Sequence, residues 1–154
     1  MLRNLNQGND MLKKFLKLST LITMVLMVNT SLAFEVSGES FPANFKMTSW
    51  SSTSDSSSLT AEGVVGEGYG KVYLSYEFKS NSNNRNKGNF SGSLRSINND
   101  GDMVAASLQG IWKRDGKIVT MYTLDSFSNG DMIYAEGLVD LVESTMKFNA
   151  FPIE

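Results

Sequence analysis

The chain has 154 residues, with 14 Lys and Arg, 16 Asp and Glu and a formal net charge of −2 at pH 7. It contains neither cysteine nor histidine, which excludes disulfide bonds, thiol nucleophiles, Ser-His-Asp catalysis and imidazole ligands to a metal. No catalytic motif is visible among the remaining polar side chains, so the composition favours a protein that is not an enzyme and implies no cofactor.

The first segment of the chain, residues 1–33, has the pattern of a secretory signal peptide. Three lysines precede an apolar run at 18–28, and Ser31-Leu32-Ala33 is a small-x-small cleavage site. The apolar run is shorter than the roughly 20 residues that a membrane-spanning helix needs. We therefore expect cleavage after Ala33, a secreted or periplasmic location and no transmembrane helix in the mature chain.

The start of translation has two candidates, Met1 and Met11, because Met11 stands directly before the lysines of the signal peptide. Cleavage after Ala33 leaves residues 34–154 with ten basic and fifteen acidic side chains. An acidic surface repels phosphate backbones, so we expect no nucleic-acid partner. The length of the mature chain fits one domain.

Residues 34–58 form an N-terminal segment without a steady hydrophobic period. Phe45 and Met47 alternate with polar residues, which predicts one strand. Seven of the ten residues from Ser49 to Ser58 are serine, a composition typical of an exposed, flexible loop. The sequence therefore places the core domain at 59–154.

From Leu59 onward the hydrophobic residues recur with a period of two, which indicates strands rather than helices. The predicted strands after the first are 69–78, 89–97, 103–113, 117–124, 132–142 and 145–151. Asp-Gly and Asn-Gly pairs between several of them supply the positive φ angles that tight hairpins require. Consecutive hairpins make an antiparallel meander.

Several glycines lie inside these strands in the same parity as the apolar residues: Gly92, Gly110 and Gly137. Glycine on an inward face lets a sheet coil and leaves room beside large neighbours such as Phe90 and Trp112. This pattern favours a small closed barrel of about seven or eight strands over the alternative, a β-sandwich. The glycine-punctuated meander resembles the calycin-type and allene oxide cyclase-like barrels in architecture, and that resemblance implies no activity and no site residues.

An outer-membrane barrel is a further alternative, because strand alternation does not say which face meets lipid. Two features oppose it. The chain ends in Phe151-Pro152-Ile153-Glu154 rather than in an aromatic residue, and small residues such as Ala106 and Ala135 lie on the apolar face.

The best candidates for a ligand site are aromatic residues. Tyr76, Phe78, Phe90 and Trp112 share the face expected to point inward, and Tyr122 is a possible addition. A barrel mouth lined by aromatic rings suits a small apolar ligand. The alternative is plain core packing, because side chains alone can fill a barrel of this size.

Other polar motifs have simpler explanations than chemistry. Glu62 and Glu136 precede glycines expected to face inward, so both carboxylates should point outward. Asp100-Gly101-Asp102 offers oxygen ligands of the kind that calcium uses, but lacks the EF-hand spacing and reads as a hairpin turn. We expect no metal site.

Three classes of function remain open. The favoured one is a non-catalytic binding module for a small apolar ligand. The first alternative is a secreted interaction or inhibitor protein that contacts a protein partner through the loops at Ser49–Ser58 or Lys79–Gly88. The second is a lyase or isomerase that uses Tyr and Glu side chains inside the barrel. The sequence does not identify the ligand, the partner or the oligomeric state.

Overall fold

The computed structural model describes residues 36, 39–66 and 68–153, so the predicted signal peptide and its cleavage site lie outside the described residues. Eight strands follow one another: β1 (Phe41–Ser52), β2 (Ser56–Val65), β3 (Gly70–Asn81), β4 (Asn84–Ile97), β5 (Met103–Asp115), β6 (Ile118–Phe127), β7 (Met132–Asp140) and β8 (Thr145–Pro152). Their order along the chain is also their order in the sheet. The predicted antiparallel meander is confirmed.

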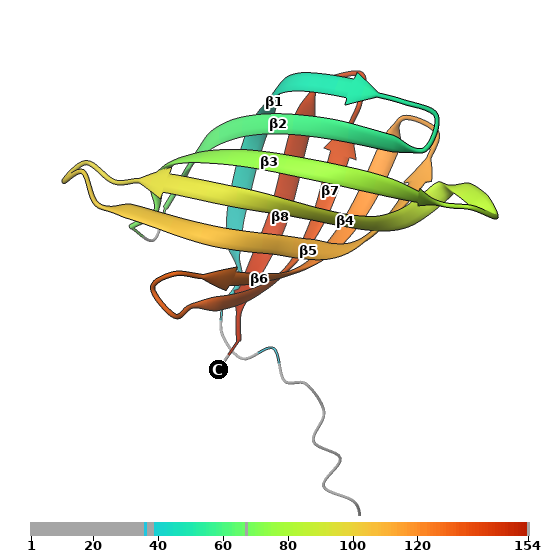
Figure 1. The fold of residues 1–154 in the computed structure, drawn as a ribbon. Helices are drawn as coiled ribbons and strands as arrows, with labels where there is room; N and C mark the ends of the chain where they lie inside the picture. The colour runs from blue at the N-terminus through green and yellow to red at the C-terminus, as the bar shows by residue number, and fades with distance from the viewer. Residues whose placement is uncertain (1–35, 37–38, 67, 154) are drawn as a thin grey trace, which may run out of the picture. The chain divides into compact units, whose positions relative to one another are not determined.

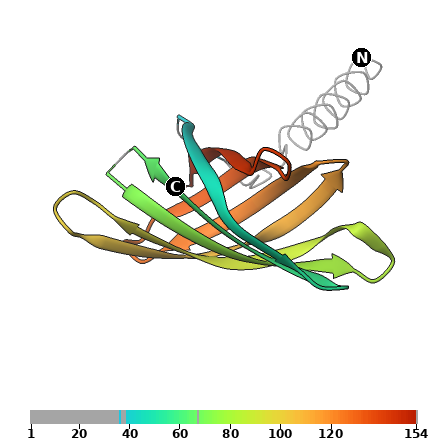
Figure 2. The ribbon, with the colours of Figure 1, turned by 90° about the horizontal axis from the view of Figure 1, so that it is seen from above.

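The sheet closes on itself because β1 pairs with β8 as well as with β2. The closing ladder runs from Phe41 opposite Ala150 to Lys46 opposite Thr145. Figures 1 and 2 show the strongly tilted strands wrapping around one interior, with the β3–β4 and β4–β5 hairpins extending from opposite ends. Closure removes exposed sheet edges and confirms the barrel over the sandwich.

The N-terminal segment differs from the prediction, because it belongs to the barrel. The barrel begins at Phe41 rather than at 59, and the serine-rich stretch is mostly strand, with only Thr53–Asp55 outside β1 and β2. Hydroxyl groups pair across these two strands, including the Oγ atoms of Ser52 and Ser57 at 3.0 Å. Serine fits a strand where its hydroxyl bonds to the facing strand. The predicted Lys79–Gly88 loop is likewise strand except at residues 82 and 83.

A register shift between Met47 and Ser49 changes which side chains of β1 face inward. Met47 lies opposite Ala61, but after the shift Trp50 lies opposite Leu59. An extra residue at a β-bulge reverses the alternation of the residues that follow it. Trp50 therefore lies on the same face as the buried Leu59, although simple alternation from Phe45 and Met47 would turn it outward.

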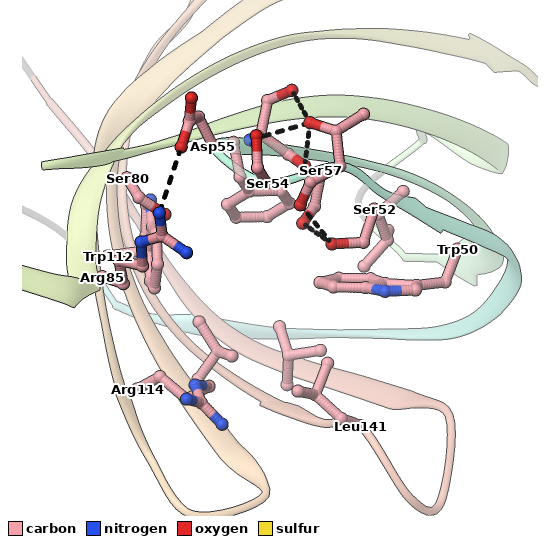
Figure 3. Close-up of a pocket in the computed structure, with 16 residues that line it drawn as sticks. Trp50, Ser52, Ser54, Asp55, Ser57, Ser80, Arg85, Trp112, Arg114 and Leu141 are labelled. Atoms are coloured by element: carbon pink, nitrogen blue, oxygen red, sulfur yellow. Dashed lines mark hydrogen bonds and ion pairs between the residues drawn. The ribbon is translucent and has the colours of Figure 1, made fainter. Parts of the chain in front are cut away.

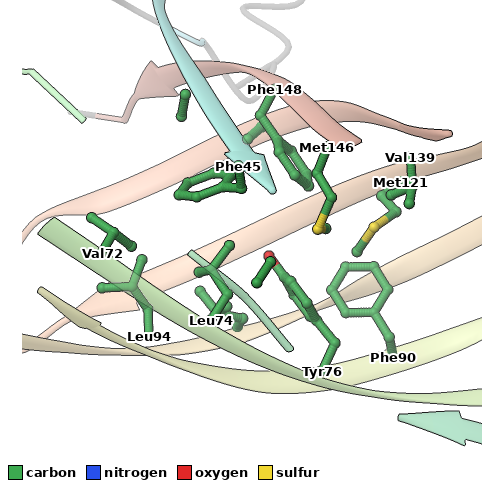
Figure 4. Packing of buried hydrophobic residues seen from close by; sticks show 14 of the residues in the cluster. Phe45, Val72, Leu74, Tyr76, Phe90, Leu94, Met121, Val139, Met146 and Phe148 are labelled. Carbon is green, nitrogen blue, oxygen red and sulfur yellow. The ribbon is translucent and has the colours of Figure 1, made fainter. Parts of the chain in front are cut away.

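The core depends on pairs of glycine and aromatic residues. Five glycines each lie directly across a strand pair from an aromatic residue: Gly63 from Phe45, Gly88 from Trp112, Gly92 from Tyr76, Gly110 from Phe90 and Gly137 from Phe148. A Cβ atom at Gly110 would lie 2.8 Å from Cζ of Phe90, and one at Gly92 would lie 2.8 Å from Cδ1 of Tyr76. The glycines make room for the rings that Figure 4 shows meeting inside the barrel.

The outer face of β3 and β4 is mainly polar. Its exposed residues include Ser75, Glu77, Ser91 and Arg95, which alternate with buried residues. A barrel in an outer membrane presents an apolar band to lipid, whereas the large hydrophobic residues exposed on these two strands are Tyr73 and Ile97 alone. Among the described residues no helix is long and apolar enough to span a bilayer.

We predict that Gly137→Ala destabilises the fold by about 1–3 kcal/mol, the range for overpacking a filled core. The new methyl group would overlap the ring of Phe148, because the three atoms nearest to a Cβ built at Gly137 all belong to that ring. Chemical denaturation with urea measures the change.

The matched control is Gly66→Ala, because no atom lies within 4 Å of a Cβ built there. Equal unfolding free energies for the two variants would contradict the role assigned to the glycine and aromatic pairs.

Candidate functional site

One end of the barrel is hollowed by a cavity of about 260 Å³. We call it the cup. It lies between the ends of the hairpins and is lined by Trp50, Ser52, Thr53, Ser54, Asp55, Ser56, Ser57, Leu59, Phe78, Ser80, Arg85, Trp112, Arg114, Val119, Val139 and Leu141. Its volume exceeds that of an engineered cavity of about 150 Å³ that binds benzene, so a small organic molecule fits.

Aromatic rings form one wall of the cup. The rings of Trp50 and Phe78 lie 6.3 Å apart, and those of Phe78 and Trp112 lie 6.1 Å apart in an edge-to-face arrangement. The Trp112 indole N–H donates to the backbone oxygens of Asn89 and Lys79, at 3.1 and 3.3 Å. Its polar group is thus satisfied within the sheet, which leaves the apolar ring surface for contact with a ligand.

Two arginines stand at the opening of the cup. Arg85 Nη2 lies 3.7 Å from an Asp55 carboxylate oxygen in an exposed ion pair, an interaction of little energy in water. Arg114 donates to Asn86 Oδ1 at 2.6 Å and to the Gly116 carbonyl oxygen at 3.2 Å. Both partners of Arg114 are uncharged, so its positive charge is not neutralised by them. Figure 3 shows Trp50 across the opening from Arg85 and Trp112.

A second, smaller cavity of about 60 Å³ lies inside the barrel toward the opposite end. We call it the inner cavity. Tyr76, Thr123, Asp125 and Phe148 are among its lining residues, and none of its lining residues lines the cup. Ring contacts link Tyr76 to Phe90 (5.5 Å), Phe90 to Phe78 (5.7 Å) and Phe78 to Trp112 (6.1 Å). This aromatic layer separates the two cavities.

Asp125 is a carboxylic acid on the inward side of β6, beside a break in the sheet. The β5–β6 ladder is regular up to Ser107 opposite Ser126 and resumes at Gly110 opposite Thr123. Between them, side chains replace ladder bonds. The Thr123 hydroxyl contacts the Gln109 carbonyl oxygen at 3.2 Å and the Asp125 carboxylate, and the Gln109 N–H also donates to that carboxylate.

The inner cavity changes the acidity of its polar groups. Burial raises the pKa of Asp125 to about 7, although hydrogen bonds from Thr123 and the Gln109 backbone oppose the rise. Burial also raises the pKa of Tyr76 well above its usual value, and the nearby charge of Asp125 adds to this effect. Tyr76 is therefore a neutral hydroxyl, and Asp125 changes charge near neutral pH.

The structure divides the predicted aromatic site. Phe78 and Trp112 line the cup, Tyr76 lines the inner cavity, and Phe90 lies in the layer between them. Tyr122 does not belong to the site, because it alternates with the buried Met121 and Thr123 and lies on the outer face. There, Lys113 Nζ lies 5.7 Å from the centre of its ring. The hairpin register sets this outcome by placing Met121 opposite Trp112.

Three residues that line these cavities were not predicted as site residues from the sequence. Trp50 faces the cup only because of the β1 bulge. Arg114 is placed at the opening by the end of β5. Asp125 lies one residue beyond the predicted strand 117–124, whereas β6 continues to Phe127, so its spacing of two from Thr123 was the available signal for an inward carboxyl group.

The other carboxylates named in the sequence analysis lie outside the two cavities. Glu77 and Glu136 are exposed on the outer face, and Glu62 pairs with Lys71 at 3.0 Å, as expected for outward side chains. In the β4–β5 turn, Asn98 accepts from the backbone N–H groups of Asp100 and Asp102. Within the described part of the chain, acidic side chains form no cluster of three that could hold a metal.

No protein-family model matches the chain, and comparison with curated proteins and with solved structures found no significant match. Conclusions about function therefore depend on the two cavities.

We predict that Asp125 makes folding stability fall as pH rises. Its folded pKa of about 7 lies above the usual aspartate value of 3.8, so between these two pH values the folded state holds a proton that the unfolded chain has released. The stability that this proton provides is full below pH 4 and is lost as pH rises through 7. Relative to Asp125→Asn, the wild type should lose about 2–4 kcal/mol between pH 4 and pH 8.

Urea unfolding of both proteins across this pH range measures the effect. The comparison cancels titrations that the two proteins share. Parallel stability profiles for wild type and variant would show that Asp125 is not buried as described.

Proposed function

We propose that the protein is an exported binding module that holds a small, mainly apolar molecule in the cup. The proposal depends on one observation: both tryptophans of the chain and two arginines line the same cavity, which has a volume of about 260 Å³. Apolar surface with a few convergent polar groups is typical of small-molecule sites.

The arginines refine the class of ligand. An apolar body would lie against Trp50, Phe78 and Trp112, and an acidic group would face Arg85 and Arg114. Guanidinium groups favour carboxylate, sulfonate and phosphate groups because several donors meet them in one plane. The proposed ligand is thus an amphipathic organic anion rather than a purely apolar molecule.

The alternatives receive less support. The stretches expected to act as loops in a protein interaction are mostly strand. An isomerase or lyase requires an ionisable side chain facing the interior, and Asp125 and Tyr76 meet that condition. The inner cavity of about 60 Å³ is small for a reactant and its movement during turnover, so we favour binding over catalysis.

Intrinsic fluorescence tests the cup directly, because Trp50 and Trp112 are the only tryptophans of the chain and both line it. We predict that 1-anilinonaphthalene-8-sulfonate, an aromatic body with one sulfonate, quenches this emission saturably. N-phenyl-1-naphthylamine, which lacks the sulfonate, should bind more weakly.

Arg114→Gln should weaken binding of the sulfonate probe by about five- to tenfold through loss of a charged hydrogen-bond donor, with little effect on the uncharged probe. The matched control is Arg95→Gln, because Arg95 is exposed on the outer face of β4. Quenching that does not saturate, or equal effects of the two substitutions, would overturn the proposed site.

Export is a separate part of the proposal. It rests on the signal-peptide pattern of residues 1–33. The mass of the chain recovered from the periplasm or the medium should correspond to residues 34–154, with Phe34 first. Recovery of the full chain from the cytoplasm would refute export and leave the cup proposal intact.

A further inference from the structure

The hydroxyl group of Tyr76 is buried, and within the part of the chain that the structure describes it has no hydrogen-bond partner. The residue is 3% exposed and lines the inner cavity. Figure 4 shows its side chain reaching from β3 into the interior. Among the described residues, no group forms a hydrogen bond with this hydroxyl. Buried polar groups are nearly always hydrogen-bonded in folded proteins. A polar molecule in this cavity could form that hydrogen bond with the Tyr76 hydroxyl.

Asp125 supplies a second polar group at the same cavity. Its carboxylate accepts from the Thr123 hydroxyl and the Gln109 N–H, and an ionised carboxylate has about four acceptor positions. Acceptor capacity therefore remains after both internal bonds are made. The rest of the lining is mainly apolar and includes Leu74, Leu94 and Leu108.

We propose that the inner cavity is a second binding site, which takes a small neutral alcohol. The hydroxyl of the alcohol donates to the Asp125 carboxylate and accepts from the Tyr76 hydroxyl, while its short carbon chain lies among the leucines. The volume of about 60 Å³ limits the guest to fewer atoms than benzene, which occupies a cavity of about 150 Å³. This site is separate from the cup and does not depend on the function proposed for it.

An alcohol fits better than other small organic molecules. Water can make the same two hydrogen bonds, but it lacks the carbon chain that contacts the apolar lining. A ketone accepts from Tyr76 but cannot donate to the carboxylate. An ammonium group donates to Asp125 but cannot accept from Tyr76, and it must lose its hydration in an apolar space. An alkane leaves the Tyr76 hydroxyl unpaired and the remaining acceptor positions of Asp125 unused.

Entry to the cavity lies at the end of the barrel away from the cup. Phe41, Tyr69 and Phe127 line the cavity there, with the ring of Tyr69 6.2 Å from Phe41 and 5.4 Å from Phe127. The Tyr69 hydroxyl donates to Asp131 at 2.8 Å, which joins the β2–β3 and β6–β7 connections. A small guest must pass this aromatic cover.

The test compares 2-propanol with acetone, which has the same heavy-atom skeleton but no donor. Ala43, Ala135 and Ala150 line the cavity, so protein labelled with ¹³C at alanine methyl groups reports on its occupancy by NMR. At pH 8.5, we expect saturable shifts of these three methyl signals and binding of 2-propanol about tenfold tighter than of acetone. Shifts that rise linearly with 2-propanol, or equal affinities for 2-propanol and acetone, would overturn the proposal.

Two variants identify the groups involved. Tyr76→Phe should weaken binding of 2-propanol about tenfold, because the ligand hydroxyl loses its donor. The control, Tyr73→Phe, removes the same atom from the exposed outer face of β3 and should leave binding unchanged. Equal affinities in the two variants would refute the role of Tyr76.

The pH dependence of the wild type provides a test that needs no variant. The inward neighbours of Asp125 on β5 and β7, Leu108 and Ile133, carry no charge. The titratable groups that share its cavity are Tyr76 and, at the entrance, Tyr69 with its partner Asp131. At pH 5, Asp125 is protonated and can donate to a ketone.

The preference for 2-propanol over acetone should therefore fall from about tenfold at pH 8.5 to near onefold at pH 5. In Asp125→Asn, the preference for 2-propanol over acetone should be small and should not differ between pH 5 and pH 8.5. A wild-type preference that stays constant from pH 5 to pH 8.5 would show that Asp125 does not contact the guest.

Discussion

The packing of aromatic rings against glycines on the neighbouring strands is the constraint on which the rest of this barrel depends. Eight strands enclose an interior just wide enough for side chains, so most of its large rings lie opposite a residue that has no side chain. Five such pairs meet this condition. Three of these rings, Tyr76, Phe90 and Trp112, form one contiguous aromatic layer together with Phe78, which lies opposite Phe90 and Ser57. That layer fills the middle of the barrel and leaves a cavity on each side.

Each cavity gains one side chain through a local departure from regular pairing. The bulge at the centre of β1 turns Trp50 toward the cup. The interruption of the β5–β6 ladder lets Thr123 and Asp125 bond to Gln109, which holds a carboxyl group inside the barrel. Regular strands build the core, and irregular positions supply groups that are not needed for packing. Bulges near sites commonly redirect a side chain in this way.

Most of the fold could be predicted from the sequence, because alternation, Asp-Gly and Asn-Gly turns and inward glycines are local signals. The β1 and β2 strands were missed in part because serine lacks a strong strand preference, and their hydroxyl pairs form only once the strands meet. Tyr122 was placed on the wrong face because its orientation depends on the hairpin register. Trp50 and Asp125 could not be assigned to cavities because a bulge and a broken ladder depend on the facing strand.

The most direct test of the central claim, that the barrel carries a small molecule in its cup, is native mass spectrometry of residues 34–154. The protein should be purified without detergent from cells that export it. If the proposed function is right, we expect a reproducible extra mass that disappears on denaturation and is reduced in Arg114→Gln but not in Arg95→Gln. A bare chain in every preparation, together with no uptake of organic anions offered in excess, would contradict the assignment of the cup as a binding site.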